Sequence, residues 1–254
     1  VCESKEEQFC FLGKNIGITA PGGYAEYVIV PDAKYLLDPG KKTPLISGCF
    51  ACSGLTAYAA IKKILFGKKS FKKSDTLVFV GLGGVGMMGL NIAINIFKKV
   101  PIVIDIDSKK LEQAKEMGVE HCYNPKDNPD FLMDLLEKTG GGADGAIDFV
   151  GSEQSFDTAF NSIKRGGSCV ITGLFGGKLQ LPLPLITLMS KKIMGSYVGN
   201  LAEMKELMAF VKKGFLPPIP IEVLEAHEVN KALKKLKSGK ALGRLILLHK
   251  SYKK

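Results

Sequence analysis

A short apolar segment that runs directly into a glycine-rich turn constrains this chain more than any other part of its sequence. Residues 77–89 read LVFVGLGGVGMMG, so a strand-like stretch leads into Gly81-x-Gly83-x-x-Gly86 and then into a helix-like stretch. Gly81 permits a tight turn, Gly83 lets the backbone approach a pyrophosphate without a Cβ, and Gly86 lets the helix pack closely on the strand. The N-terminus of that helix then faces the phosphates. The predicted cofactor-binding residues of this glycine loop are Gly81, Gly83, Gly84, Val85 and Gly86.

The glycine pattern alone is a weak signal, because the chain contains 29 glycines and many such strings are ordinary turns. A second apolar strand at 101–106 strengthens it, since this strand carries Asp105, 24 residues after Gly81. In dinucleotide-binding folds an acid near this spacing hydrogen-bonds the adenosine ribose. A phosphorylated ribose would be repelled by the carboxylate, so NAD is favoured over NADP. The alternative is that Asp105 ends a strand or caps the next helix, a role that Asp107 or Ser108 also fits.

The composition is that of a globular protein. With 254 residues, 46% of them hydrophobic, the chain is able to bury a core in one or two domains. No uninterrupted apolar run of about 18 residues occurs, so we expect no transmembrane helix and no membrane partner. The charged start, VCESKEE, argues against a secretory leader, and the absence of an initial Met predicts a processed or incomplete chain.

The net charge of +10 comes mainly from lysine pairs along the chain. These pairs lack interleaved aromatic residues and fall at expected helix ends and loops, which favours a solvated surface over a nucleic-acid groove. We therefore expect no nucleic-acid partner. Six cysteines without secretory features indicate a reducing compartment, the cytoplasm, with thiols that serve as metal ligands or packing residues before disulfides.

Strand-like and helix-like stretches alternate between residue 52 and about residue 197. The expected strands are 77–80, 102–106, 121–123, 145–150, 168–172 and 192–197. The expected helices are 54–65, 84–98, 108–117, 129–138 and 153–164. This alternation predicts an α/β fold with a parallel, doubly wound sheet of the Rossmann type.

The two flanking segments follow a different pattern. Residues 1 to about 50 read as short strands and turns of a small β-rich unit, with the strand-like stretch GGYAEYVIV at 22–30. After residue 199 we expect a helix at 201–213, a proline-rich break at 217–220, a helix at 228–237 and a closing strand at 243–248.

Several separated motifs together resemble the zinc-dependent medium-chain alcohol dehydrogenases, over nearly the whole chain. Cys2 and Cys10 are similar to the last two thiolates of that family's structural zinc lobe, of which the first two are missing. The other matching segments are GGYAEY at 22–27, ACSGLTAY at 51–58, the glycine loop, DIDSKKLEQAKEMG at 105–118, SYVGN at 196–200 and Gly243-Arg244. Members of the family also carry an N-terminal half-domain, absent here, that supplies two catalytic zinc ligands and a proton-relay hydroxyl. The resemblance is therefore to an N-terminally truncated member.

The resemblance implies three segments. Residues 1–51 would be part of a GroES-like, β-rich catalytic domain, residues 52–198 the NAD-binding Rossmann domain, and residues 199–254 the return to the catalytic domain. A homodimer or homotetramer is implied by the resemblance alone.

The resemblance also implies roles for individual residues. Cys52 matches the third ligand of the catalytic zinc, although a single Cys at a helix start is more often a small buried hydrophobe. Thr56 matches the residue that touches the nicotinamide ring, and Val85 would pack on the ring's other side, although both also suit an ordinary helix. Lys110 matches a lysine near the adenosine ribose, with a solvated surface lysine as the alternative. Arg244 matches an arginine that pairs with the pyrophosphate, with Gly243 leaving room for the cofactor. Cys49 reads as a packing residue.

The implied activity is that of an NAD-dependent zinc alcohol dehydrogenase, which interconverts an alcohol and its aldehyde or ketone by hydride transfer. Zinc suits this chemistry because a Lewis acid stabilises the alkoxide at neutral pH. Two alternatives stay open: a truncated NAD-binding module without turnover, and a zinc-free quinone or enoyl reductase of the same superfamily. The cysteines at 2, 10 and 52 argue against the second alternative.

Overall fold

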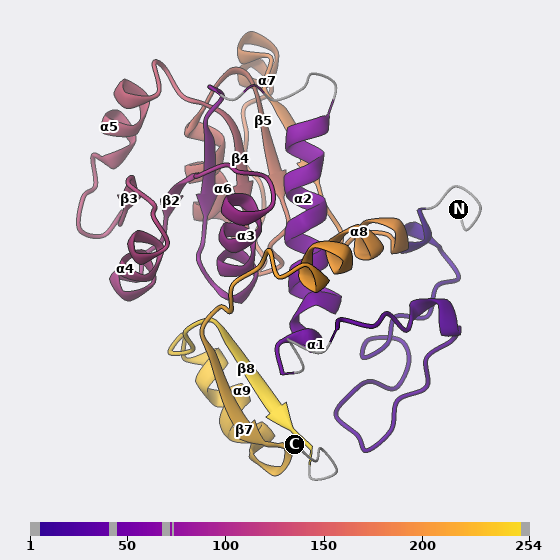
Figure 1. Cartoon of the computed structure of the whole chain (residues 1–254). Helices are drawn as coiled ribbons and strands as arrows, with labels where there is room; N and C mark the ends of the chain where they lie inside the picture. Colours follow the sequence, from indigo (N-terminus) through magenta and orange to yellow (C-terminus); the bar gives the residue numbers. More distant parts are fainter. Residues whose placement is uncertain (1–5, 41–44, 68–71, 73, 250–254) are drawn as a thin grey trace. The chain divides into compact units, whose positions relative to one another are not determined.

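The structure, a computed structural model, describes residues 6–40, 45–67, 72 and 74–249 (Figure 1). The chain divides into two compact units. The first unit contains the residues up to Cys52 and those from Gly199 onward, and the second unit is Ser53–Val198. The second unit contains the glycine loop.

The second unit is built on a six-stranded, wholly parallel sheet with the strand order β3-β2-β1-β4-β5-β6. The strands are β1 (Leu77–Val80), β2 (Ile102–Ile104), β3 (Cys122–Tyr123), β4 (Ala143–Asp148), β5 (Ile163–Ile171) and β6 (Lys192–Gly195). β1 and β2 are runs of buried, largely β-branched residues, as expected for strands of a parallel sheet that is covered on both faces. The predicted doubly wound α/β fold is confirmed.

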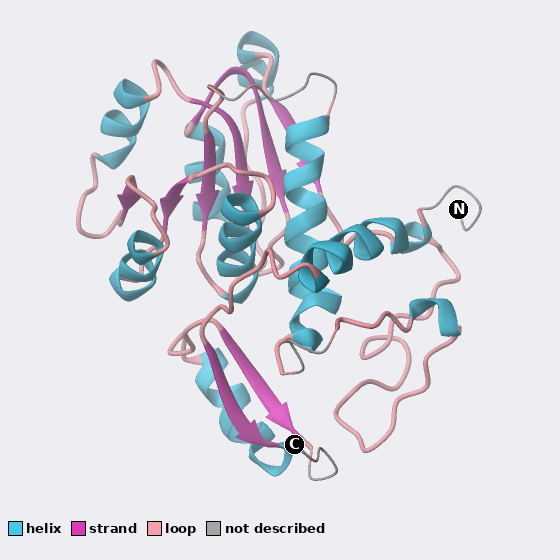
Figure 2. Ribbon diagram, in the orientation of Figure 1, coloured by secondary structure: helices cyan, strands magenta, loops and turns pink. Residues whose placement is uncertain are grey.

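Helices cover both faces of this sheet (Figure 2). They are α2 (Leu55–Phe66), α3 (Gly84–Asn95), α4 (Ser108–Glu116), α5 (Phe131–Lys138), α6 (Glu153–Asn161) and α7 (Leu183–Met189). Val78 and Val80 of β1 belong to the core that α5 and α6 cover, together with Phe131 and Phe156. The intervening Phe79 makes an edge-on contact with Phe149, with ring centroids 5.1 Å apart. Successive side chains of β1 therefore serve the two opposite layers, which is the period of two expected of a strand.

The five predicted helices and six predicted strands of this unit are all present, with shifted ends. β5 begins at Ile163, five residues earlier than predicted, and α3 ends three residues earlier. Helix α7 was not predicted. Its sequence, LPLITLM, is apolar almost throughout and therefore shows no amphipathic period, and prolines stand at 182 and 184, at its start. None of its side chains is buried.

The long helical stretch Ser47–Phe66 joins the two units in sequence. It consists of α1 (Ser47–Cys49), the π-helical turn η3 (Phe50–Gly54) and α2. By length and composition this stretch is apolar enough to cross a membrane, but 72% of its most apolar window is buried inside the protein. The apolar character is therefore that of a core helix, in which Ala57, Ala60 and Ile61 are wholly buried.

The predicted strand at 22–30 is wrong. The described residues before α1 form two short 3-10 turns, η1 (Glu7–Phe9) and η2 (Ala33–Tyr35), and one isolated bridge between Ile16 and Ala20. Tyr27 and Ile29 are each 89% exposed. A strand needs a neighbour to accept and donate its backbone hydrogen bonds, and no described segment pairs with this one.

The C-terminal part of the first unit contains α8 (Leu201–Lys212), β7 (Ile221–Glu225), η4 (Ala226–Glu228), α9 (Val229–Lys237) and β8 (Arg244–Leu248). Asn200 and Glu203 form a capping box at the start of α8. The amide of Leu201 also donates to the Glu7 carboxylate at 2.8 Å, which ties the two sequence parts of this unit together. β7 was not predicted. It pairs in parallel with β8, and its sequence signal is the two β-branched residues Ile221 and Val223 that follow the proline-rich break.

Candidate functional site

The glycine loop lies where the strand order of the sheet reverses. From β1 the chain proceeds to β2 and β3 on one side, and then returns to β4 on the other side of β1. The last residue of β1, Val80, is paired with Asp148 at the end of β4. In open α/β sheets ligands bind in the crevice at this switch point, outside the carboxyl ends of the strands.

The three glycines of the motif differ in the space that a Cβ atom would have at each position. Gly81 has a φ of 90°, and a Cβ there would lie 2.3 Å from a methyl carbon of Val150. A Cβ at Gly86 would lie 1.9 Å from the carbonyl oxygen of Gly81, so this glycine lets the first turn of α3 pack against the loop. A Cβ at Gly83 would meet no protein atom within 4 Å. The first and third glycines are therefore required by the fold, whereas nothing in the folded protein requires the second.

Gly83 is also the N-cap of α3, and it has no side chain to accept from the helix amides. The first helical bond runs from the amide of Met87 to the carbonyl of Gly83 at 2.8 Å. The preceding amides of Gly84, Val85 and Gly86 belong to the helix turn that has no intrahelical acceptors. An open, uncapped helix N-terminus beside Gly83 is a suitable place for a phosphate group.

Asp105 lies directly beside the loop. It is 8% exposed, and its carboxylate accepts hydrogen bonds from the amide of Leu82 in the loop and from the amide of Asp107 at 2.9 Å. The amide of Gly81 in turn donates to the carbonyl of Ile104 at 2.8 Å. The end of β2 and the glycine loop are thus held together at two points. The helix-cap role belongs to Asp107, whose carboxylate accepts from the amide of Lys109 at 3.0 Å.

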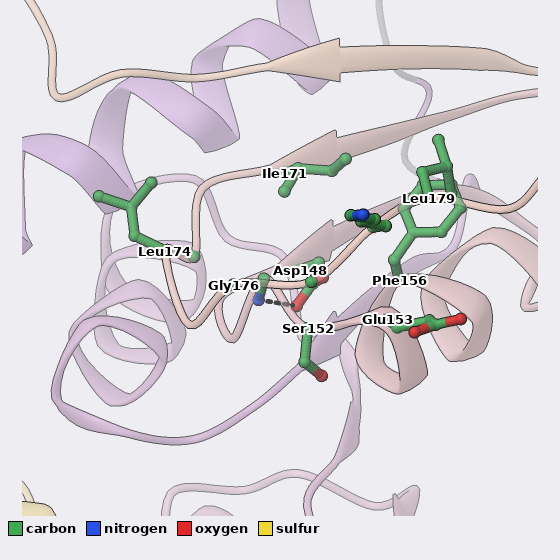
Figure 3. Close-up of a pocket in the computed structure, with 12 residues that line it drawn as sticks. Asp148, Ser152, Glu153, Phe156, Ile171, Leu174, Gly176 and Leu179 are labelled. Atoms are coloured by element: carbon green, nitrogen blue, oxygen red, sulfur yellow. Dashed lines mark hydrogen bonds between the residues drawn. The ribbon is translucent and has the colours of Figure 1, made fainter.

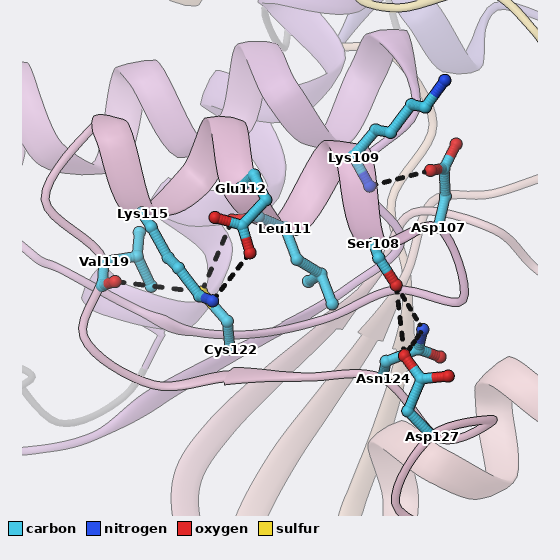
Figure 4. A network of polar contacts seen from close by, with 10 residues as sticks. All are labelled: Asp107, Ser108, Lys109, Leu111, Glu112, Lys115, Val119, Cys122, Asn124 and Asp127. Atoms are coloured by element: carbon cyan, nitrogen blue, oxygen red, sulfur yellow. Dashed lines mark hydrogen bonds and ion pairs between the residues drawn. The ribbon is translucent and has the colours of Figure 1, made fainter.

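A polar network surrounds the start of α4 (Figure 4). The side-chain amide of Asn124, just after β3, donates to the Ser108 hydroxyl at 2.8 Å and to the Asp127 carboxylate at 2.6 Å. Lys110, predicted to approach the ribose, points its ammonium at Asp107, 3.7 Å away, and its side chain is only 15% exposed. Its role toward a cofactor stays a prediction. The network fixes the loops that follow β2 and β3, on the Asp105 side of the crevice.

Asp148 is a buried site residue that the sequence argument missed. Its carboxylate accepts from the amides of Val150 at 2.8 Å and Gly151 at 3.0 Å and from the Ser155 hydroxyl at 2.9 Å. Burial raises the pKa of this carboxyl above its usual value, against the effect of these three donors. The missed signal was an acid that ends a buried strand, as Asp105 does on the other side of β1. Asp148 thereby shapes the turn that contacts Gly81.

Asp148→Asn is expected to change how stability depends on pH. A raised pKa in the folded state means that the folded protein holds this proton more tightly than the unfolded chain. The resulting stability is present below the unfolded value of 3.8 and is lost as the pH rises through the folded value. The amide of Asn stays neutral at every pH. The wild type should therefore lose unfolding free energy relative to the variant as the pH rises from acidic to neutral. Urea denaturation across this pH range measures the unfolding free energy of both proteins. An equal dependence on pH in the two proteins would contradict the raised pKa of Asp148.

Two further glycines join the ends of β4 and β5. A Cβ at Gly151 would lie 2.0 Å from the carbonyl oxygen of Gly173, and one at Gly173 would lie 2.0 Å from the carbonyl carbon of Val150. Beside this close approach is a pocket of about 290 Å³ (Figure 3). Its walls include Phe156, Ile171 and Leu179. The pocket therefore extends the switch-point crevice along the carboxyl ends of β4 and β5.

The predicted ligand of the catalytic zinc, Cys52, and one predicted nicotinamide contact, Thr56, lie on the long helical stretch, whereas Val85 lies in the first turn of α3. Cys52 is exposed in the π-helical turn η3, Cys49 before it is buried, and Thr56 in α2 is buried. Single π-helical turns inside α-helices occur frequently at functional sites, which fits a reactive role for Cys52. The glycine loop, Asp105 and Asp148 all belong to the second unit, whereas Cys10, Cys52 and Arg244 belong to the first. Cys2 lies outside the described residues.

The prediction that Gly243 leaves room for the cofactor is wrong. Gly243 has a φ of 67°, and a Cβ there would lie 2.0 Å from the carbonyl oxygen of Pro220. The space beside it is thus occupied by backbone of the same unit and is not kept for a cofactor. Arg244 begins β8, and its amide donates to that same carbonyl at 3.0 Å. Its pairing with a pyrophosphate stays a prediction.

The comparison with known proteins agrees with this geometry. The family model described as zinc-binding dehydrogenase matches residues 84–213, from the start of α3 to the end of α8. A protein of Sulfurisphaera tokodaii named NAD-dependent alcohol dehydrogenase is 33% identical over 249 residues, which are 97% of this chain and 70% of that protein. The chain belongs to the zinc-binding dehydrogenase family. As a member of this family it is an oxidoreductase of the alcohol dehydrogenase group.

Solved structures of alcohol dehydrogenases share the fold. The alcohol dehydrogenase of Aeropyrum pernix is 27% identical, with a TM-score of 0.84 over 97% of this chain and 71% of its own. The cobalt- and zinc-bound thermostable alcohol dehydrogenase of Pyrobaculum aerophilum is 25% identical, with a TM-score of 0.81 over 97% of this chain and 70% of its own. Each of these two structures matches 97% of this chain, which includes residues of both units.

A metal site is not assembled by the described part of this dehydrogenase. Among those residues no group of three or more His, Cys, Asp and Glu side chains is placed to hold a metal ion. A zinc site needs three or four protein ligands. A dinucleotide fits the described residues better than a metal ion does. Gly83, whose surroundings are free of protein atoms on the Cβ side, and the Asp105 carboxylate both lie at the switch point.

Proposed function

We propose that this family member is an NAD-dependent zinc alcohol dehydrogenase that interconverts an alcohol and its aldehyde or ketone. The observation that carries the proposal is the hydrogen bond from the Leu82 amide to the Asp105 carboxylate. It places an acid suited to ribose hydroxyls against a loop suited to a pyrophosphate, at the switch point of a parallel sheet. The name of the Sulfurisphaera tokodaii relative supports the same cofactor and reaction.

Each part of the dinucleotide would meet a different group of this chain. The amides that begin α3 would hold the pyrophosphate, and the absent Cβ of Gly83 leaves it room. The Asp105 carboxylate would accept from the ribose hydroxyls, because two amides already fix its orientation. NAD, when bound, accepts the hydride from the carbon of the alcohol. We propose Thr56 and Val85 as the contacts of the nicotinamide ring.

Cys52 is the zinc ligand that we propose for this chain, because it offers an exposed thiol in an irregular helical turn. The described residues do not complete the ligand set, so a bound zinc ion requires further donors. Cys10 is half-buried in the first unit and stays a proposed ligand of a structural zinc together with Cys2.

Cys52→Ser is expected to remove most of the zinc that the protein binds and most of its alcohol turnover, because a serine hydroxyl is a poor zinc ligand. Zinc per chain is measured by mass spectrometry of the purified protein, and turnover by NADH absorbance with primary and secondary alcohols. Cys122→Ser is the matched control, since Cys122 lies in β3 of the second unit. If Cys52→Ser binds as much zinc as the wild type does, Cys52 is not a zinc ligand.

A second candidate function follows from the incomplete ligand set: a module that binds NAD without turnover. The same measurements separate the candidates. NAD binding with neither zinc nor alcohol turnover favours the module. Turnover of a quinone or an enoyl substrate without metal favours the zinc-free reductase.

We propose a homodimer or homotetramer as the assembly. β6 is the outer strand of the sheet, and an outer strand carries backbone groups able to pair with a second copy. Exposed leucines of α7 lie in the segment before it, Leu183 at 76% and Leu188 at 67%. Light scattering of the purified chain measures the assembly, and a monomer at all concentrations would contradict it.

A further inference from the structure

Asp127, in the loop after β3, accepts two side-chain hydrogen bonds at the start of α4 (Figure 4). Its carboxylate accepts from the Ser108 hydroxyl at 3.1 Å and from the side-chain amide of Asn124 at 2.6 Å. Asp127 is exposed, and among the described residues no lysine or arginine forms an ion pair with it. Its negative charge therefore lies close to the first turn of α4.

The loop that carries Asp127 lies next to Asp105, because β2 and β3 are paired in parallel. The last residue of β2, Ile104, lies opposite Tyr123, and the amide of Asp105 donates to the Tyr123 carbonyl at 3.1 Å. Ser108, the first residue of α4, follows Asp105 by three residues. A dinucleotide whose ribose hydroxyl binds Asp105 therefore has its 2′ position near the start of this helix.

The start of α4 has groups of the kind that a 2′-phosphate needs. A helix N-terminus attracts anions, and Ser, Asn and Lys side chains donate hydrogen bonds to phosphate oxygens. Ser108, Lys109 and Lys110 form the first turn of this helix. The side-chain amide of Asn124 lies beside it, 2.8 Å from the Ser108 hydroxyl. By these groups alone, the chain would suit NADP as well as NAD.

Carboxylates of the protein already hold these donors. Asp127 accepts from both neutral side chains at this place, the hydroxyl and the amide. Asp107 accepts from the helix amide of Lys109 at 3.0 Å and lies 3.7 Å from the ammonium of Lys110. A phosphate at this place would have to displace these contacts, and it would be repelled by two carboxylates.

We propose that Asp127 is a second determinant of cofactor choice, an internal anion that takes the place of a 2′-phosphate and thereby excludes NADP. The inference rests on the proposed function and extends it beyond Asp105. Asp105 accepts a hydrogen bond from the free ribose hydroxyl, whereas Asp127 occupies the neutral donors that a phosphate would need. Two acids on different loops then act against the same phosphate group.

Asp127→Ala is expected to raise the affinity for NADP by about three- to tenfold at low ionic strength, because it frees two donors and removes one negative charge. The affinity for NAD, which lacks the 2′-phosphate, should stay that of the wild type. The gain for NADP should shrink at high ionic strength, since salt screens an exposed charge. Calorimetric titration of the full chain with NAD and with NADP, at low and at high salt, measures these affinities.

Two further variants separate the charge of Asp127 from the structure of its loop. Asp127→Asn removes the charge and keeps an oxygen for the Ser108 hydroxyl, so it gives the same readout should Asp127→Ala loosen the loop. Asp130→Ala is the matched control. Asp130 is an exposed acid three residues further on, and its side chain makes no capping hydrogen bond at the start of α5. This variant should bind both nucleotides as the wild type does.

The outcomes separate this proposal from the proposed function. Tighter NADP binding in both Asp127 variants, with unchanged NAD affinity and no gain in Asp130→Ala, supports it. If NAD binds but neither Asp127 variant gains affinity for NADP, or if Asp130→Ala gains as much, the role of Asp127 is refuted and the proposed function stands. If the wild type binds neither nucleotide, both are refuted.

Discussion

Gly83→Ala is expected to weaken NAD binding by about 1 to 3 kcal/mol, or about 5- to 150-fold in Kd, while the protein folds as the wild type does. A Cβ at this position meets no protein atom within 4 Å, and the backbone there, with φ −66° and ψ −170°, is allowed for alanine. The new methyl group would meet only a ligand that lies against the loop. Calorimetric titration with NAD measures the affinity, and urea denaturation measures the stability.

Gly86→Ala is the contrasting variant. Its Cβ would lie 1.9 Å from the carbonyl oxygen of Gly81, so the loop and α3 have to move apart even without cofactor. We expect it to lower the unfolding free energy by about 1 to 3 kcal/mol. If Gly83→Ala instead binds NAD as tightly as the wild type does, the pyrophosphate does not lie against this loop.

Asp105→Ala is expected to produce the second large effect, on both affinity and stability. The change removes the acceptor of two amides, and an unsatisfied buried donor costs about 1 to 3 kcal/mol. It also removes the acceptor of the ribose hydroxyls, and hydrogen bonds to a charged group are worth about 1.5 to 3 kcal/mol. NAD affinity should therefore fall by at least about tenfold. Calorimetric titration and urea denaturation again provide the two measurements.

Asp105→Asn separates the two contributions. Asparagine keeps a carbonyl oxygen for the Leu82 amide but carries no charge to repel a phosphorylated ribose. The variant should be more stable than Asp105→Ala, and its preference for NAD over NADP should shrink. If both variants prefer NAD over NADP as strongly as the wild type does, Asp105 does not contact the ribose.

The local part of this site was predictable because strand, turn and helix follow one another within a few residues. The glycine loop, the strand that ends near Asp105 and the helix that Asp107 caps are all encoded by neighbouring residues. Hydrophobic runs and glycine positions predict such units directly. The hydrogen bond between Leu82 and Asp105 then follows from the parallel pairing of β1 with β2.

The remaining features depend on contacts between segments that are distant in sequence. The close approach of Gly151 and Gly173 and the position of Asp148 exist only once β4 lies between β1 and β5. Gly243 looked like a place for a ligand because Pro220, which fills that space, is more than twenty residues away in the chain. The segment 22–30 has the composition of a strand, but a strand is formed by its partner as much as by its own residues.

Calorimetric titration of the purified chain with NAD and, separately, with NADP tests the central claim most directly. A chain that holds an adenine dinucleotide between its glycine loop and Asp105 should give a saturable heat with NAD and a weaker response with NADP. No heat with either nucleotide, or tighter binding of NADP, would contradict this account.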